Sequence, residues 1–345
     1  MARRGGLQVG VMGQFVMLAL AWGASFLFIK VGLEGLSPPQ VVLGRLLAGA
    51  GALAVVSLVG RRPLPRELAV WGHLAVVSVL LCVMPFLLFA WAEQHVSSGL
   101  ASIYNATTPL MTMLVALGAL PDERPTRTKL TGLLVGFAGV LVVLGPWNGL
   151  AGGEGLGQAA CLLATLCYGA AFVYLRRFIS PRGLGAIPVA TVQVGLGASI
   201  MLLLAPLTAT APVHLSWRVG LSVAALGVLG TGLAYVWNTN VVSEWGATNA
   251  STVTYLTPVV GVALGIAVLG ETLTWNEPLG AMILVTGIAV SQGRLKPSAR
   301  RTRPAYEAIA PPPHGPVPGD PPAALHNGEP EVSLPQNRGD MRYEE

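Results

Sequence analysis

Two prolines inside apolar stretches follow clusters of hydroxyl, amide and phenol side chains that could line a binding cavity. Pro109 follows ASIYNATT, and Pro258 follows ASTVTYLT. Within lipid, a proline leaves a carbonyl without its helical hydrogen bond, so nearby polar groups must satisfy that carbonyl or face a cavity. We therefore expect a helix break or hinge at both prolines, with a cavity between them. A purely structural kink, satisfied by threonine hydroxyls, is the alternative.

Aromatic and basic side chains inside other apolar stretches are further candidates for the cavity. An unpaired arginine at depth, such as Arg45, costs about 2.5–3.5 kcal/mol on insertion scales, so it should face protein or water. It could attract a carboxylate or phosphate. Alternatively, it could tie to a helix end or to Glu93, or extend outward so that its charged group reaches the membrane surface. The candidate binding residues are Trp22, Arg45, Tyr104, Asn105, Thr108, Tyr168, Tyr235, Asn238, Thr254 and Tyr255.

The elements that must hold these residues are membrane-spanning helices. The 345 residues are 53% hydrophobic and only 11% charged, whereas soluble domains carry about 25% charged residues. Runs long enough to cross a hydrocarbon core of about 30 Å recur along the chain. They predict ten helices, near 13–33, 39–60, 68–91, 98–120, 130–147, 156–175, 185–206, 217–239, 247–270 and 278–293. We expect an all-α integral membrane protein.

Lysine and arginine predict the orientation of this bundle, because cytoplasmic loops of membrane proteins are enriched in both. With a cytoplasmic N-terminus and C-terminus, the external loops hold only Arg218. The internal segments then hold Arg3, Arg4, Arg61, Arg62, Arg66, Arg124, Arg127, Lys129, Arg176, Arg177, Arg182, Arg294, Lys296, Arg300, Arg301 and Arg303. The net charge of +5 is explained by topology, and no nucleic acid is needed as a partner.

The sequence repeats in a way that predicts two related halves. AWGASFLFIK at 21–30 resembles CYGAAFVYLR at 167–176, and the alanine, serine, threonine and proline of 101–109 recur at 250–258. Two five-helix units, 1–150 and 151–293, account for this pattern. Because five is odd, the second unit must enter the membrane from the opposite face, which predicts inverted repeats with a binding site between them.

These residues resemble the drug/metabolite transporter superfamily, in its EamA-like branch. The resemblance rests on Trp22-Gly23 with Lys30, on Arg45, on the two proline segments and on LGETLTWNEPLGAMILVTGIAV at 269–290. It implies a ten-helix carrier that exports amino acids, related metabolites or drugs by alternating access. The excess of arginine over lysine, 18 to 3, and the richness in alanine, glycine and proline favour a bacterial source, and so the inner or plasma membrane of a bacterium. The first half has Pro121-Asp122-Glu123 where the second has Gly270-Glu271, and so departs from the family pattern there.

Titratable groups that could couple such a carrier to protons lie only at the ends of the spans. The candidates are Glu93, His95 and Glu271, and no aspartate lies inside a span. Coupling through these outer residues is one hypothesis. Transport that simply follows the substrate gradient is the other.

Other classes of membrane protein are less well matched by the sequence. A lipid-modifying enzyme or intramembrane protease would need clustered nucleophiles, bases or metal ligands, and HExxH, GxSxG and a Cys/His cluster are all absent. No catalytic residue, metal or cofactor is predicted. The proline-rich segment 294–345 is expected to be a disordered cytoplasmic tail, so a tail-signalling protein is a further alternative. The expected partners are a small-molecule substrate and the lipid bilayer, and glycines spaced four apart leave a homodimer open.

Overall fold

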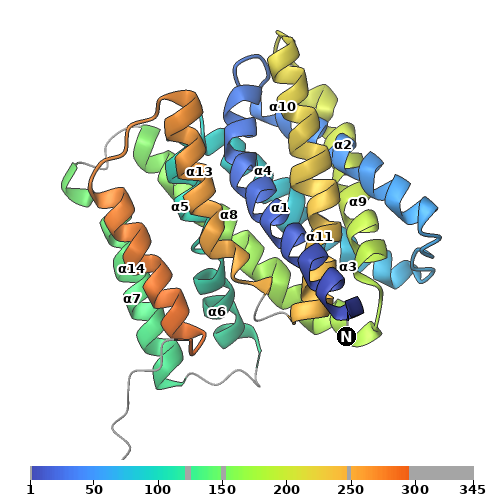
Figure 1. Cartoon of the computed structure of the whole chain (residues 1–345). Coiled ribbons are helices and arrows are strands. Elements are labelled where there is room, and N and C mark those ends of the chain that lie inside the picture. Colours follow the sequence, from blue (N-terminus) through green and yellow to red (C-terminus); the bar gives the residue numbers. More distant parts are fainter. Residues whose placement is uncertain (1, 121–125, 149–152, 247–249, 295–345) are drawn as a thin grey trace, which may run out of the picture. The chain divides into compact units, whose positions relative to one another are not determined.

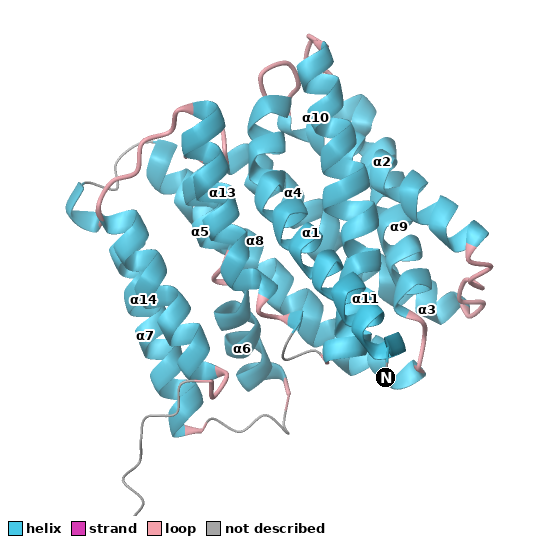
Figure 2. Cartoon of the chain, viewed as in Figure 1, coloured by secondary structure: helices cyan, strands magenta, loops and turns pink. Residues whose placement is uncertain are grey.

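The structure, a computed structural model, describes residues 2–120, 126–148, 153–246 and 250–294. Within these ranges the chain is helical and contains no strand, in agreement with the predicted all-α class (Figure 2). The predicted tail lies outside the described residues beyond Arg294, and so do three residues of the predicted span 247–270.

The helices follow one another with short connections. In chain order they are α1 (Ala2–Gly32), α2 (Pro38–Val59), α3 (Leu68–Ser78), η1 (Val79–Val83), α4 (Met84–Ala92), α5 (Ser98–Asn105), α6 (Thr108–Ala119), α7 (Arg127–Leu144), η2 (Pro146–Asn148), α8 (Gly153–Tyr174), η3 (Leu175–Ile179), η4 (Ser180–Arg182), α9 (Ala186–Thr208), α10 (Trp217–Gly227), η5 (Val228–Leu233), α11 (Ala234–Trp245), α13 (Val253–Leu269) and α14 (Asn276–Ser291).

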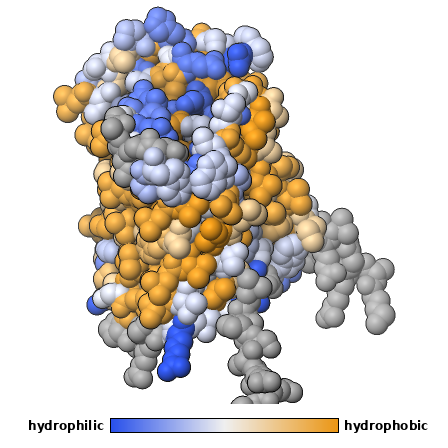
Figure 3. All heavy atoms as spheres, turned by 90° about the vertical axis from the view of Figure 1, so that its left-hand side faces the viewer, coloured by the Kyte–Doolittle hydropathy of each residue, from blue (hydrophilic) through white to orange (hydrophobic). Residues whose placement is uncertain are grey.

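Eight helical stretches of the described chain are long and apolar enough to cross a membrane, and α13 and α14 are shorter apolar helices. The sixth stretch runs on to Arg182, past its predicted end at 175, because η3 and η4 extend α8. Figure 3 shows apolar side chains across the middle of one face, with hydrophilic residues toward its upper and lower ends. Such a band fits a multi-pass membrane protein, since lipid tails contact apolar side chains.

Two of the spans contain a wide π-helical turn at their middle. Val79–Val83 (η1) joins α3 to α4, and Val228–Leu233 (η5) joins α10 to α11. A π-helical turn inserts an extra residue into the helix and often marks a functional site. Leu81 of η1 and Thr231 of η5 both line the cavity described below.

Glycines allow α7 and α14 to pack with their backbones in contact. The two helices lie side by side (Figure 1). A Cβ atom added at Gly139 would fall 2.5 Å from the Leu284 nitrogen, and one at Gly287 would collide with the backbone of Gly136. Part of the predicted set of closely spaced glycines is therefore used for packing within the chain.

The loops meet at two ends of the helical unit. At one, here called the Lys30 end, Lys30 Nζ donates to the carbonyls of Glu93 and Val96, and the His214 backbone N–H donates to Gly35 O. At the other, the Arg176 end, Arg182 pairs with Glu67 at 3.4 Å. The Arg182–Glu67 pair joins two loops that the charge pattern assigns to one side of the membrane.

Candidate functional site

A cavity of about 630 Å³ lies among helices from both halves of the chain. Its lining comes from α1, α2, η1, α4, α5, α6, α7, α8, η3, η5, α11, α13 and α14. Lys129, Arg176 and Gln292 extend its lining to the Arg176 end, whereas Lys30, Glu93 and Glu271 are absent from the lining. The cavity is large enough for a small organic molecule, whose sites are typically about 300–1,000 Å³.

The cavity brings together most of the candidate binding residues named from the sequence. Those that line it are Trp22, Arg45, Asn105, Thr108, Tyr168, Tyr235, Asn238 and Thr254. They come from six separate helical stretches, so only the tertiary fold assembles them. Their position in the lining does not by itself establish binding, so a role in binding stays a prediction for each of them.

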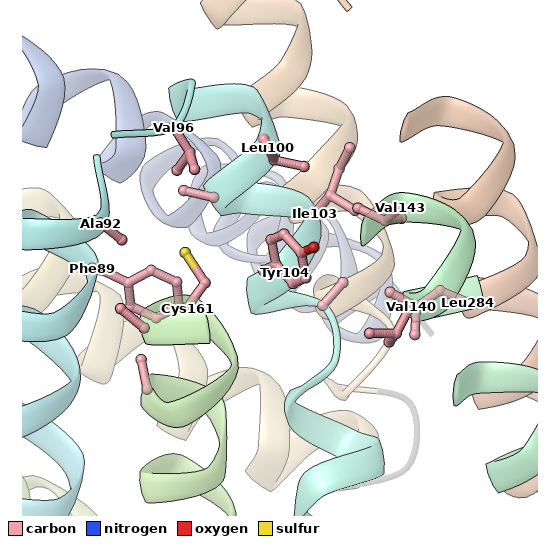
Figure 4. Close-up of a cluster of buried hydrophobic side chains, with 14 of the residues drawn as sticks. Phe89, Ala92, Val96, Leu100, Ile103, Tyr104, Val140, Val143, Cys161 and Leu284 are labelled. Carbon is pink, nitrogen blue, oxygen red and sulfur yellow. The ribbon is translucent and has the colours of Figure 1, made fainter. Parts of the chain in front are cut away.

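Tyr104 and Tyr255 lie elsewhere. Tyr104 is fully buried in a cluster with Phe89, Leu100 and Cys161 (Figure 4), and its hydroxyl donates to Gln158 Oε1 at 3.0 Å. The hydroxyl of Tyr255 donates to Gln292 Oε1 at 2.7 Å and is outside the cavity lining. Both phenols are satisfied by amides of neighbouring helices, which gives them a packing role.

Arg45 is a buried residue of the cavity lining, and its guanidinium makes a hydrogen bond and a cation–π contact. Its Nε donates to the Thr231 hydroxyl at 3.0 Å, and its guanidinium carbon lies 3.6 Å from the centre of the Phe86 ring. The latter distance is well within the range of a cation–π interaction. The expected alternative, a tie to Glu93, is not formed: among the described residues, both carboxyl oxygens of Glu93 lack a hydrogen-bond partner.

Aromatic rings form one wall of the cavity and a polar network holds part of it in place. The ring of Phe89 lies between those of Phe26 and Tyr168 along this wall. Its centroid is 5.5 Å from that of Phe26 and 6.2 Å from that of Tyr168. Gln193, buried in α9, donates to the Tyr235 hydroxyl at 2.8 Å. The wall offers apolar area to a ligand, and Gln193 fixes the position of Tyr235.

The two prolines differ in their local structure. Pro109 is the second residue of α6, which begins directly after a turn at Ala106 and Thr107, and it lines the cavity. Pro258 lies inside α13, which continues through it, and it is outside the lining. The predicted break near Pro258 is therefore displaced: the irregular turn in this half is at 251–252, before α13 begins.

The coupling candidates lie at the Lys30 end. Glu93 is fully buried directly after the span that ends at Ala92, and burial raises the pKa of its carboxyl well above the usual range. Lys30 opposes this rise in pKa and Glu271 adds to it. The ring of His95 packs on that of Trp91, with centroids 4.3 Å apart, and its Nδ1 lies 3.1 Å from the Trp91 carbonyl oxygen.

Glu271 has a different environment from Glu93. Its carboxylate accepts hydrogen bonds from the backbone N–H groups of Ser98 and Gly99 at 2.7 and 3.0 Å, and from the Ser98 hydroxyl at 3.0 Å. A carboxylate at a helix N-terminus is favoured by the helix dipole. Glu271 thus caps α5 from the connection between α13 and α14.

Several cavity residues escaped the sequence analysis. Phe86 and Thr231, the partners of Arg45, are among them. Gln193, which donates to Tyr235 from outside the cavity lining, was not predicted either. A signal existed for two of these: Gln193 is a lone amide, and Thr231 a lone hydroxyl between two glycines, inside apolar stretches. Phe86 carries no such signal, because phenylalanine is ordinary in a membrane span.

A cavity enclosed by membrane-length helices is the arrangement of a membrane carrier. The chain belongs to the EamA-like transporter family, whose model matches residues 11–145 and 155–292. It is 28% identical over 286 residues to an uncharacterized transporter, YdfC, of Bacillus subtilis, covering 81% of this chain and 90% of the relative.

Other relatives have names that specify a cargo. A probable terminal-alkyne amino-acid exporter of Streptantibioticus cattleyicolor is 26% identical over 287 residues, covering 81% of this chain and 92% of that protein. A probable amino-acid metabolite efflux pump of Salmonella typhimurium is 25% identical over 292 residues, covering 80% and 92%. A crystal structure 18% identical in sequence aligns with a TM-score of 0.57 over 82% of this chain and 96% of its own, a likeness of fold alone.

Proposed function

We propose that the chain is a secondary transporter that exports small organic metabolites, such as amino acids and related compounds, or drugs, by alternating access. The observation that carries this proposal is the cavity, which holds aromatic, hydroxyl, amide and basic groups between helices of both halves. Family membership and the exporter names of two relatives support it.

The proposed architecture is ten spans in two inverted five-helix units, 1–150 and 151–293, with cytoplasmic termini in the cell membrane. The two separate matches to the family model support the two units, and so do the π-helical turns in the third span of each unit. The proposed transport cycle exposes the cavity first at the Arg176 end and then at the Lys30 end. Contacts of Lys30 and Glu271 would have to open for the second step.

Proton coupling through Glu93 and Glu271 is part of the proposal, with His95 as the remaining candidate. The proximity that lets Glu271 raise the pKa of Glu93 supports the pairing of these two carboxyls. Because both carboxyls lie at the Lys30 end, opening of that end in the proposed transport cycle would change their surroundings and therefore their protonation.

Export is tested by comparing metabolites released by matched cells with and without the chain, followed by uptake of the enriched compound into inverted vesicles. We expect accumulation in the medium and saturable vesicle uptake. No difference in either measurement would contradict the function. Cysteine labelling tests orientation: Arg182→Cys should react from the cytoplasmic side and Arg218→Cys from the outer side, and the reverse pattern would contradict the topology.

A further inference from the structure

The cavity lining carries basic charge without acidic charge. Among the described lining residues, the charged ones are Arg45, Lys129 and Arg176, and none is aspartate or glutamate. A cleft with low-dielectric walls and charge of one sign concentrates ligands of the opposite sign. Lys129 and Arg176 also interact with other groups of the chain, so the preference against a cationic solute is inferred from the buried Arg45.

Arg45 has unused hydrogen-bonding capacity at a buried position. Only 8% of the residue is exposed. The bond from Nε to Thr231 is its one hydrogen bond within the described part of the chain, so its two terminal nitrogens have no protein acceptor there. A guanidinium stays charged under all ordinary conditions, and its terminal N–H groups match the two oxygens of a carboxylate.

The contacts of Arg45 hold the guanidinium in one orientation. The Thr231 hydroxyl is itself oriented, because it lies 3.4 Å from Leu226 O and can donate there while its lone pair accepts from Arg45. Phe86 covers one side of the guanidinium at 3.6 Å. A cation fixed in this way is prepared to bind an anion with little further loss of side-chain freedom.

The surroundings of Arg45 define the rest of the ligand. Trp22, Phe89 and Tyr168 line the same cavity, and aromatic side chains contribute large apolar contact areas. A carboxylate attached to an apolar or aromatic body would satisfy both parts of this cavity.

We propose that the cavity selects organic carboxylates and that Arg45 binds the carboxylate group, with Thr231 and Phe86 as its positioning residues. This inference rests on the proposed function and narrows it to one substrate class. An amphipathic cation is excluded as the preferred cargo, and a zwitterionic amino acid is bound through its carboxylate.

The test measures equilibrium binding of four probes that share one phenyl group and differ in charge. The purified full chain in detergent is titrated with 3-phenylpropionate, phenylalanine, 3-phenylpropanamide and 2-phenylethylamine. Detergent removes the difference in membrane permeation among the probes. We expect 3-phenylpropionate to bind at least about tenfold more tightly than the amide and the amine, since a bidentate arginine–carboxylate pair is strong. The affinity for phenylalanine should lie between that for 3-phenylpropionate and those for the amide and the amine.

Variants assign this order to the arginine. Arg45→Gln should abolish the preference for the carboxylate, and Arg45→Lys should retain it in weaker form because the charge stays while the fork is lost. Arg218→Gln is the matched control, since it removes the same charge at an exposed pair with Glu34. If Arg45→Gln fails to fold, the order of the four probe affinities for the unaltered protein still tests the preference for the carboxylate.

Two results would overturn the inference: equal binding of acid, amide and amine, or unchanged acid binding in a folded Arg45→Gln protein. Absence of binding by all four probes would overturn it as well. None of these results touches the export measurement on cells and vesicles, which tests transport without assuming the charge of the cargo. A failure of the export measurement would instead contradict the proposed function, on which the carboxylate inference rests.

Discussion

Glu271, in the connection after α13, accepts hydrogen bonds from both the backbone N–H and the hydroxyl of Ser98, at 2.7 and 3.0 Å. The two residues are far apart in the chain and belong to different halves. Their contact caps α5 and fastens the second half to the first at the Lys30 end. One carboxylate therefore holds together elements that the proposed transport cycle would separate.

Replacing Glu271 by alanine should destabilise the protein clearly. The first turn of α5 would lose three acceptor contacts, and hydrogen bonds to charged groups contribute about 1.5–3 kcal/mol each. We expect a lower apparent melting temperature in detergent. Glu34→Gln, at an exposed pair 3.8 Å from Arg218, should change it little. Equal melting temperatures for Glu271→Ala and the unaltered protein would contradict a structural role for the cap.

Glu93 should make stability depend on pH. Because burial raises the pKa of its carboxyl in the folded protein, the folded state holds the proton more tightly than the unfolded state, whose pKa is about 4.3. Its contribution to stability is complete below the unfolded pKa and is lost as pH rises through the folded pKa.

Thermal unfolding between about pH 5 and about pH 8 measures this dependence. We expect the melting temperature of the unaltered protein to fall toward high pH, and that of Glu93→Gln to fall less because the amide stays neutral. His95→Gln serves as a control substitution at a neighbouring polar side chain. Parallel curves for Glu93→Gln and the unaltered protein would show that Glu93 does not titrate there.

The glycine contact between α7 and α14 should resist even one added methyl group. Gly287→Ala would drive a Cβ atom into the Gly136 backbone, and such overpacking costs about 1–3 kcal/mol. Gly195→Ala is the control, because no described atom beyond its own stretch of helix lies within 4 Å of its added Cβ. Melting temperatures should fall for the first and stay level or rise for the second; equal shifts would argue against the close packing.

A bulky side chain inside the cavity should stop transport without unfolding the protein. Thr254 lines the cavity, whereas Val259 on the same helix is 63% exposed. We expect Thr254→Trp to lose most vesicle uptake of the identified substrate, and Val259→Trp to keep it. Circular dichroism and gel filtration would check folding in both. Full uptake by a folded Thr254→Trp protein would mean that the substrate follows another route.

The sequence predicts the helices well because span length and hydropathy are local properties. Eight spans and two shorter apolar helices lie close to the ten predicted stretches. α13 begins later than the predicted stretch 247–270 because of the turn at 251–252. Hydropathy does not reveal this turn, because the stretch predicted from it continues through these residues without a break. Hydropathy likewise gave no sign of the π-helical turns, since an extra residue in a helix leaves composition unchanged.

Side-chain direction was harder to predict than span position. Tyr104 and Asn105 are neighbours, yet Asn105 lines the cavity and Tyr104 enters a packed cluster. Successive helical residues point about 100° apart, and no sequence pattern says which one faces the cavity. The partnership of Arg45 with Thr231 depends on contacts between α2 and η5, which only the tertiary fold creates.

The extra residue in η5 has a consequence for everything that follows it in the same span. One helical residue corresponds to about 100° of rotation, so the bulge sets the azimuth of Tyr235 and Asn238 around their helix axis. If one residue within Val228–Leu233 were deleted, the span would still be long and apolar enough to cross a membrane. Its α11 would nevertheless be turned by about 100°, which would move Tyr235 and Asn238 out of the cavity lining and bring Val236 and Thr239 closest to their former positions.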